Sequence, residues 1–214
     1  MENSEKILKN LSKNISFQLK QIFGYPFVDF RISHVGETFE ELINEETDEV
    51  LPSFKLLFDT FVSKWSKQFE NQNVNETAIK GRVARMWASL AREWYAYYRI
   101  KEKFKEKNIP AQVTRNDSLD TFKGIDVYIE NKKSPDKSIK LDILQETQRA
   151  KQFRAIKDDH RVKDREVPGI KIKILLGSGN KNTLNVPDFD GNDWYLIADS
   201  EIENIIQKFN EINS

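Results

Sequence analysis

Apolar residues recur at spacings of three and four over a long segment in the middle of the chain. The recurring positions are Ile79, Val83, Met86, Trp87, Leu90, Trp94 and Tyr97. A stripe with this period is typical of an amphipathic helix. It predicts one long helix from Ile79 to Lys107, which Pro110 ends because proline cannot continue a helix.

The first 75 residues show the same spacing in shorter stretches. They carry one set of apolar positions at Ile7, Leu8, Leu11, Ile15 and Leu19, and a second at Phe54, Leu57, Phe58, Phe61, Val62 and Trp65. Turn-forming residues separate these stretches. We therefore expect a helical N-terminal region over residues 1–75 and a second region over residues 76–214.

After Pro110 the pattern changes to short runs of strand-forming residues. The runs are PAQVT, GIDVYIE, SIKLDILQ, IKIKILL and DWYLIA. A helix is predicted from Gln148 to Lys163, and another in SEIENIIQKFNEI, with Ser200 as its N-cap and Glu203 completing a capping box. This order predicts an α/β fold with a mixed central β-sheet flanked by helices.

Three acidic residues interrupt these apolar patterns. Asp126 lies in the second predicted strand, Asp142 lies in the third, and Glu93 borders the apolar stripe of the long helix. If the two strands form a hairpin, Asp126 and Asp142 are neighbours near its open end, where two carboxylates repel unless a cation separates them. Two alternatives stay open: the aspartates face solvent, or Glu93 pairs with Arg85 or Arg92.

Composition restricts the kind of metal that such a site could hold. The chain of 214 residues is 38% hydrophobic and 11% aromatic, with no Cys and only two His. Thiolate sites are therefore excluded and an all-histidine site is disfavoured, whereas oxygen ligands favour Mg²⁺, Mn²⁺ or Ca²⁺. The polar start and the lack of any long apolar run predict a cytoplasmic protein that does not enter a membrane.

The 34 basic and 34 acidic residues balance, but they are segregated along the chain. Nine acids and two bases lie between Asp29 and Asp59, whereas nine bases and three acids lie between Ile79 and Lys107. Between Lys140 and Lys173 there are ten bases and six acids. Segregation of this kind can produce a positive cleft in a neutral protein, or simply differing solvated helix faces.

Three stretches together resemble a known family. They are RVARMWASLAREWYAYYRI, GIDVYI and LDILQETQRAKQFR, spanning Arg82 to Arg154. The order of a helix with an acid, a strand with Gly-Ile-Asp, a strand with a second acid and a basic helix resembles the PD-(D/E)XK nuclease core. More narrowly, it is similar to the TaqI-like type II restriction endonucleases.

The resemblance implies a Mg²⁺-dependent endonuclease that cuts a short palindrome in double-stranded DNA. It implies Asp126 and Asp142 as metal ligands and Glu93 as the acid of the helix. Two partners are expected, double-stranded DNA and a second copy of the chain in a homodimer. The residues expected to contact DNA lie on two basic helix faces: Arg85, Arg92, Arg149, Lys151, Arg154, Lys157 and Arg161.

One position departs from the family pattern. Two residues after the acid of the third strand the pattern has a lysine, but this chain has Leu144, followed by Gln145. Either Gln145 takes the place after a one-residue bulge, or Lys123 or Lys151 reaches in, or the site is weakened. We assign Gln145 a catalytic role as the hydrogen-bonding group that orients water.

Two other functions remain possible on the sequence alone. The chain could be a non-catalytic or weakly active nucleic-acid-binding protein on a degraded nuclease core, for which Leu144 is the best argument. It could also be a protein-interaction domain that docks through the acidic stretch between Asp29 and Asp59.

Overall fold

A computed structural model gives the fold. It describes residues 34–45, 51–70, 75–115, 124–145, 167–177, 180, 183–186 and 194–214. The chain divides into two compact units, one of Met1–Arg92 with Phe189–Gly191 and one of Glu93–Asp188 with Asn192–Ser214. The division expected between residues 75 and 76 stays a prediction.

The described part of the first unit is helical, as predicted for the N-terminal region. It contains α2 (Val35–Glu45), α3 (Phe54–Trp65), α4 (Lys67–Glu70) and the start of α5. Ser53 caps α3 by accepting a hydrogen bond from the backbone amide of Leu56 at 3.1 Å. The indole of Trp65 donates to the Thr38 hydroxyl at 3.1 Å, which fixes α3 against α2. The predicted apolar stripe between Ile7 and Leu19 lies outside the described residues.

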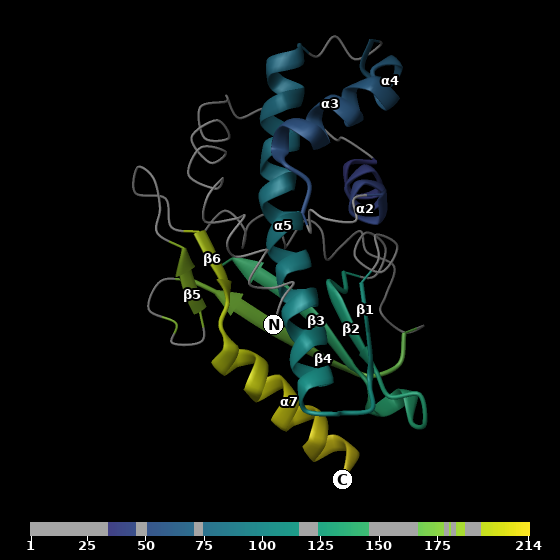
Figure 1. The fold of residues 1–214 in the computed structure, drawn as a ribbon, viewed down its shortest axis with the longest axis vertical. Coiled ribbons are helices and arrows are strands. Elements are labelled where there is room, and N and C mark those ends of the chain that lie inside the picture. Colours follow the sequence, from purple (N-terminus) through teal and green to yellow (C-terminus); the bar gives the residue numbers. More distant parts are fainter. Residues whose placement is uncertain are drawn as a thin grey trace. The chain divides into compact units, whose positions relative to one another are not determined.

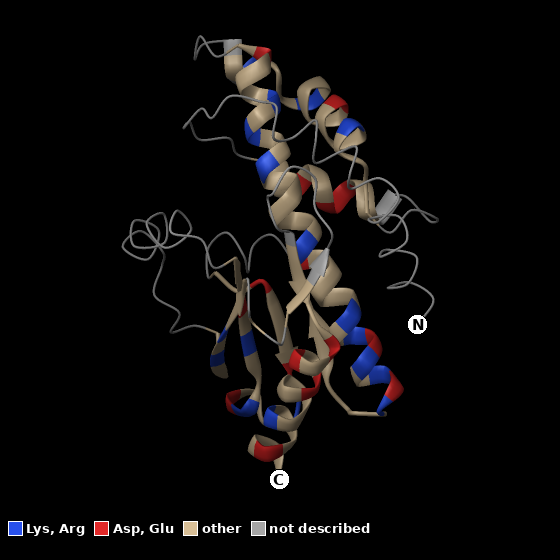
Figure 2. Cartoon of the chain, turned by 90° about the vertical axis from the view of Figure 1, so that its left-hand side faces the viewer, with Lys and Arg blue, Asp and Glu red and all other residues tan. Residues whose placement is uncertain are grey.

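The long central helix is confirmed as α5 (Glu76–Glu106). Most of its apolar positions are buried, among them Val83, Trp87, Leu90 and Trp94, whereas Met86 and Tyr97 are half-buried. Lysine and arginine recur along its whole length, whereas three of its four acids lie from Glu93 onward (Figure 2). The helix runs from the first unit into the second, where its C-terminal part helps to cover the sheet.

A four-stranded mixed sheet forms the centre of the second unit (Figure 1). Its strands follow chain order: β1 (Gln112–Thr114), β2 (Val127–Glu130), β3 (Ile139–Gln145) and β4 (Ile170–Leu176). The first three strands are antiparallel neighbours, and β4 pairs in parallel with β3. All four strands match predicted runs, and the mixed α/β class is confirmed. The helix predicted from Gln148 to Lys163 lies outside the described residues.

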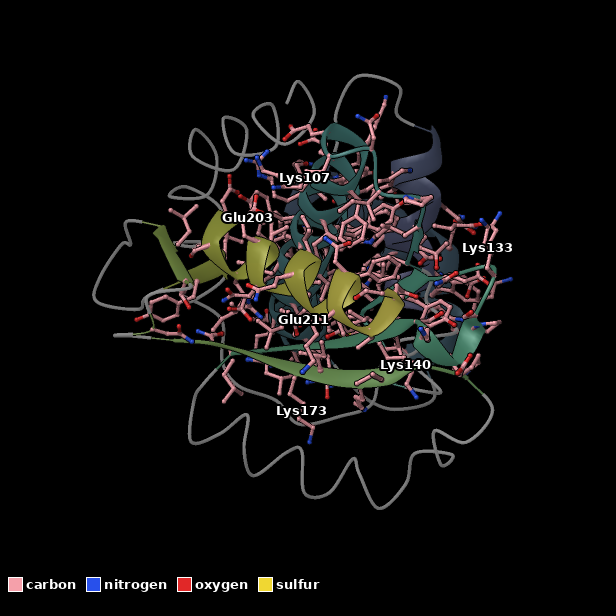
Figure 3. The ribbon with its side chains drawn as sticks, turned by 90° about the horizontal axis from the view of Figure 1, so that it is seen from below. Lys107, Lys133, Lys140, Lys173, Glu203 and Glu211 are labelled. Carbon is pink, nitrogen blue, oxygen red and sulfur yellow. The ribbon has the colours of Figure 1, made fainter. Side chains whose placement is uncertain are left out.

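One face of this sheet is apolar and packs under helices. Alternation along the strands places Val127 and Ile129 of β2 on the same face as Leu141 and Ile143 of β3, and all four are buried. The C-terminal part of α5 and α7 (Asp199–Asn213) lie on this side of the sheet (Figures 1 and 3). The opposite face carries Tyr128, Lys140, Asp142, Leu144, Lys171 and Lys173.

Gly169 fixes the start of β4 beside β3. Its φ angle is +113°, and a Cβ atom at this position would lie 2.5 Å from the carbonyl oxygen of Ser138. The next residue, Ile170, donates its backbone amide to that same carbonyl at 2.7 Å. Only glycine combines this backbone angle with such a close approach.

The C-terminal elements correct two expectations. The strand β5 (Thr183–Val186) was not predicted; it pairs antiparallel with the predicted β6 (Trp194–Ile197) in a separate two-stranded sheet. The N-cap of α7 is Ala198, not Ser200, so the predicted capping box is wrong. Asp199 explains the earlier start, because a carboxylate in the first turn is stabilised by the helix dipole and here also binds Arg99 of α5.

None of the described helices is both long enough and apolar enough to cross a membrane.

Candidate active site

Asp126 sits immediately before β2 and its side chain extends the pairing of β2 with β3. Its backbone amide donates to the carbonyl of Leu141 at 2.8 Å, and its carboxylate accepts a hydrogen bond from the backbone amide of Ile143. The residue is 5% exposed. The carboxylate is therefore held by the main chain of β3, directly beside the position of Asp142.

Asp142 lies on β3, on the face of the sheet that α7 does not cover. Continuing the β2–β3 register one residue beyond the pair Val127–Leu141 sets Asp142 opposite Asp126. The two aspartates are thus neighbours at the open end of the hairpin. The side chain of Asp142 is 6% exposed, and the Lys171 ammonium lies 3.8 Å from its Oδ2 atom. A buried acid needs such a partner, because burial without compensation is costly.

The pairing of β3 with β4 shows which face of the sheet carries each residue after Asp142. The pairing runs without interruption from Ile139–Ile170 to Gln145–Leu176. Leu144 therefore shares the face of Asp142, and Gln145 lies on the opposite, helix-covered face. The one-residue bulge that would bring Gln145 next to Asp142 is not present in this ladder, so its assigned part in orienting water has no geometric support.

Glu93 is buried in an ion pair with a residue that sequence reasoning did not consider. A guanidinium nitrogen of Arg115 donates to Oε2 of Glu93 at 2.8 Å, and the two side chains are 0% and 10% exposed, respectively. The same guanidinium lies 4.8 Å from the ring centre of Trp94. The expected pairing of this acid with an arginine is correct in kind, and the arginine found here, Arg115, directly follows β1.

The described residues contain no cluster of three or more acidic or histidine side chains arranged to hold a metal ion. Glu93 therefore does not join Asp126 and Asp142 in one group. Two carboxylates nevertheless fit Mg²⁺, which proteins commonly hold through one or two carboxylates with water and phosphate oxygens completing the shell. Asp126 and Asp142 are the pair that could hold the ion.

The residues expected to contact DNA are only partly within the described structure. Arg149, Lys151, Arg154, Lys157 and Arg161 lie outside it, as does Lys123. On α5, Arg85 is half-buried and Arg92 is 7% exposed. An arginine as buried as Arg92 offers little surface to a phosphate, so a DNA contact by this residue stays a prediction that its burial does not favour.

A second charged contact lies between α5 and α7. Arg99 donates to both carboxylate oxygens of Asp199, at 2.8 and 2.5 Å. This hydrogen bonding lowers the pKa of Asp199 below its ordinary value and raises the pKa of Arg99. Nearby, burial raises the pKa of Tyr95 to about 12. Lys107 adds an ion pair with Glu203 of α7 at 2.8 Å, and both residues are labelled in Figure 3.

Sequence reasoning did not identify Arg115 and Lys171 as partners of Glu93 and Asp142, although the sequence carries a signal for each of them. Arg115 follows the inward-facing Val113 by two positions, so strand alternation points it toward the core. Lys171 and Lys173 alternate with isoleucines in β4 and so share one face. That this face is also the face of Asp142 follows only from the parallel pairing with β3.

Searches of protein-family models, of curated proteins and of solved structures each found no match to this chain.

Proposed function

We propose that this protein is a Mg²⁺-dependent endonuclease of the type II restriction class, which hydrolyses phosphodiester bonds in double-stranded DNA at a short specific sequence. One observation carries the proposal: two buried aspartates, Asp126 and Asp142, occupy opposed positions at the open end of the β2–β3 hairpin. The resemblance of Arg82–Arg154 to the TaqI-like restriction endonucleases supplies the reaction class.

The surroundings of the two aspartates support this proposal. The backbone amide of Ile143 in β3 donates to the Asp126 carboxylate and so restricts the rotation of that side chain. A divalent cation bound there would activate water and stabilise negative charge on the phosphate. The protein's own contribution is to orient two acidic ligands on adjacent strands. The resemblance implies a catalytic part for Glu93, which here pairs with Arg115, and that part and the homodimer stay predictions.

A plasmid-cleavage assay tests the proposal, and the choice of variant matters. Asp126→Ala would remove the acceptor of the Ile143 amide, so lost activity could reflect lost structure. Asp126→Asn keeps an oxygen acceptor and removes the charge. The matched control is Asp136→Asn, which changes an exposed aspartate in the loop of the same hairpin.

The parental chain and Asp136→Asn should convert supercoiled plasmid to discrete fragments in Mg²⁺ and not in a chelator. Asp126→Asn should lose cleavage while unfolding at nearly the parental temperature. Cleavage by Asp126→Asn at the parental rate would remove the metal-site assignment.

A second candidate function is a non-catalytic or weakly active nucleic-acid-binding protein. It is favoured by Leu144, which is buried on the face of Asp142, and by Lys171, which already balances part of the charge of that acid. A gel shift that weakens steeply with salt, without cleavage in any divalent metal, would support this candidate over the endonuclease.

A further inference from the structure

On β3, no lysine or arginine follows Asp142 on the same face of the sheet. Leu144 occupies the next position on this face, and it is 7% exposed. Lys140, two residues before Asp142, is 6% exposed and donates to the carbonyl of Val167 at 3.0 Å. Its ammonium group therefore helps to hold the chain that leads into β4.

The neighbouring strand brings two lysines to this face. In the parallel ladder Lys171 pairs with Lys140 and Lys173 pairs with Asp142, so both lysines share the face of the acid. The side chain of Lys173 points away from α7 in Figure 3. The Lys171 ammonium lies 3.8 Å from Oδ2 of Asp142.

Lys171 and Asp142 differ in their exposure to solvent. The Asp142 side chain is 6% exposed, whereas that of Lys171 is 30% exposed. The ammonium group is thus partly open to solvent beside a buried acid, and a phosphate must also reach that acid from the solvent. A bound phosphate oxygen near Asp142 would lie within the reach of the same ammonium group.

We infer that Lys171 supplies the positive charge beside the scissile phosphate that Leu144 cannot supply. This inference rests on the proposed endonuclease function. Hydrolysis of a phosphodiester increases negative charge on the phosphoryl oxygens, and a positioned cation stabilises that charge more in the transition state than in the ground state. No bond to Lys171 forms or breaks in this step. The loss of one such donor lowers the rate by roughly 10²–10³-fold.

Three variants distinguish the effect of the Lys171 charge from the effects of its side-chain length and of its position on β4. Lys171→Met removes the charge and keeps an unbranched side chain, while Lys171→Arg keeps the charge. Lys173→Met is the matched control, since it removes an exposed lysine from the same strand and the same face. Because Lys171 is itself exposed, all three should unfold close to the parental temperature.

The first measurement is single-turnover cleavage of plasmid in saturating Mg²⁺. Lys171→Met should fall by roughly 10²–10³-fold, and Lys171→Arg and Lys173→Met should stay within about tenfold of the parental rate. If Lys171→Met cleaves at the parental rate, or if Lys171→Arg loses as much as Lys171→Met, the inference is overturned while the endonuclease function stands. If the parental chain cleaves in no divalent metal, the endonuclease function is refuted and the role of Lys171 falls with it.

The second measurement needs no turnover. Mn²⁺ binding to the protein without DNA should tighten by about fivefold or more in Lys171→Met, because a cation competing for Asp142 is removed. Lys173→Met should change it less. Equal Mn²⁺ affinity in Lys171→Met and the parental chain would overturn the inference, since the ammonium group would then exert no field on the acid.

Discussion

The buried pair of Glu93 and Arg115 offers the sharpest test of what holds the second unit together. We consider Glu93→Gln, which keeps the shape of the side chain and removes its charge. The pair is almost fully desolvated, with side chains 10% and 0% exposed, and its nitrogen–oxygen distance is 2.8 Å. The substitution removes the negative charge that Glu93 places beside the buried Arg115 guanidinium.

The expected cost follows from this burial. Removing one partner of a buried ion pair destabilises a protein by about 3–5 kcal/mol, mostly because the remaining charge stays desolvated. Arg115 keeps its contact with the Trp94 ring at 4.8 Å, which places the expected loss for Glu93→Gln at the lower end, about 3 kcal/mol. Arg115→Met should cost as much or more, because it also gives up the ring contact.

Urea unfolding at neutral pH, followed by circular dichroism and tryptophan fluorescence, measures these losses. The double variant Glu93→Gln/Arg115→Met should be less destabilised than the sum of the two single variants, with a coupling of roughly 1–3 kcal/mol. A loss below about 1 kcal/mol for Glu93→Gln, the level of an exposed pair, would refute the reasoning. Glu93 would then be available for a role other than this pairing.

Two further predictions concern α7 and β4. Hydrogen bonds from Arg99 lower the pKa of Asp199 below its ordinary value of 3.8. The contribution of this carboxylate to the free energy of unfolding is therefore complete above pH 3.8, and it is lost as the pH falls through the lower pKa of the folded state. Since Asp199 is half-exposed, Asp199→Asn should lower the free energy of unfolding by up to about 1 kcal/mol at neutral pH. The difference from the parental chain should vanish in strong acid, and urea unfolding across this pH range measures both values. Gly169→Ala should lower stability by at least about 2 kcal/mol, because the new methyl group meets the Ser138 carbonyl and φ is positive; an unchanged melting temperature would contradict the described start of β4.

The elements that sequence reasoning predicted well are those with a repeated local pattern. The stripe from Ile79 to Tyr97 identified α5 because every third or fourth side chain is apolar, and that period depends only on neighbours in the chain. IKIKILL matches β4 from its first residue to its last. β5 was missed because its four residues, TLNV, are too short and too polar to stand out from a loop.

Errors arose where a long-range contact outweighed a local preference. Ser200 has the side chain of an N-cap, but Asp199 is drawn into the first turn of α7 by Arg99, which is far away in the sequence. The partners of Glu93 and Asp142 were missed for a related reason. Alternation assigns each strand residue to a face, but it does not say which strand becomes the neighbour. Arg115 and Lys171 became visible as partners only through the three-dimensional pairing.

The parallel pairing of β3 with β4 also fixes when Asp142 acquires its ammonium partner during synthesis. A ribosome completes β1, β2 and β3 before it makes β4, and the short hairpin between Glu130 and Ile139 can close early. The contact between Ile139 and Ile170 closes a longer loop, which costs more chain entropy and folds more slowly. A nascent chain that ends after β3 carries both aspartates but not Lys171. In our proposal, such a chain could bind a metal ion before it could hydrolyse DNA.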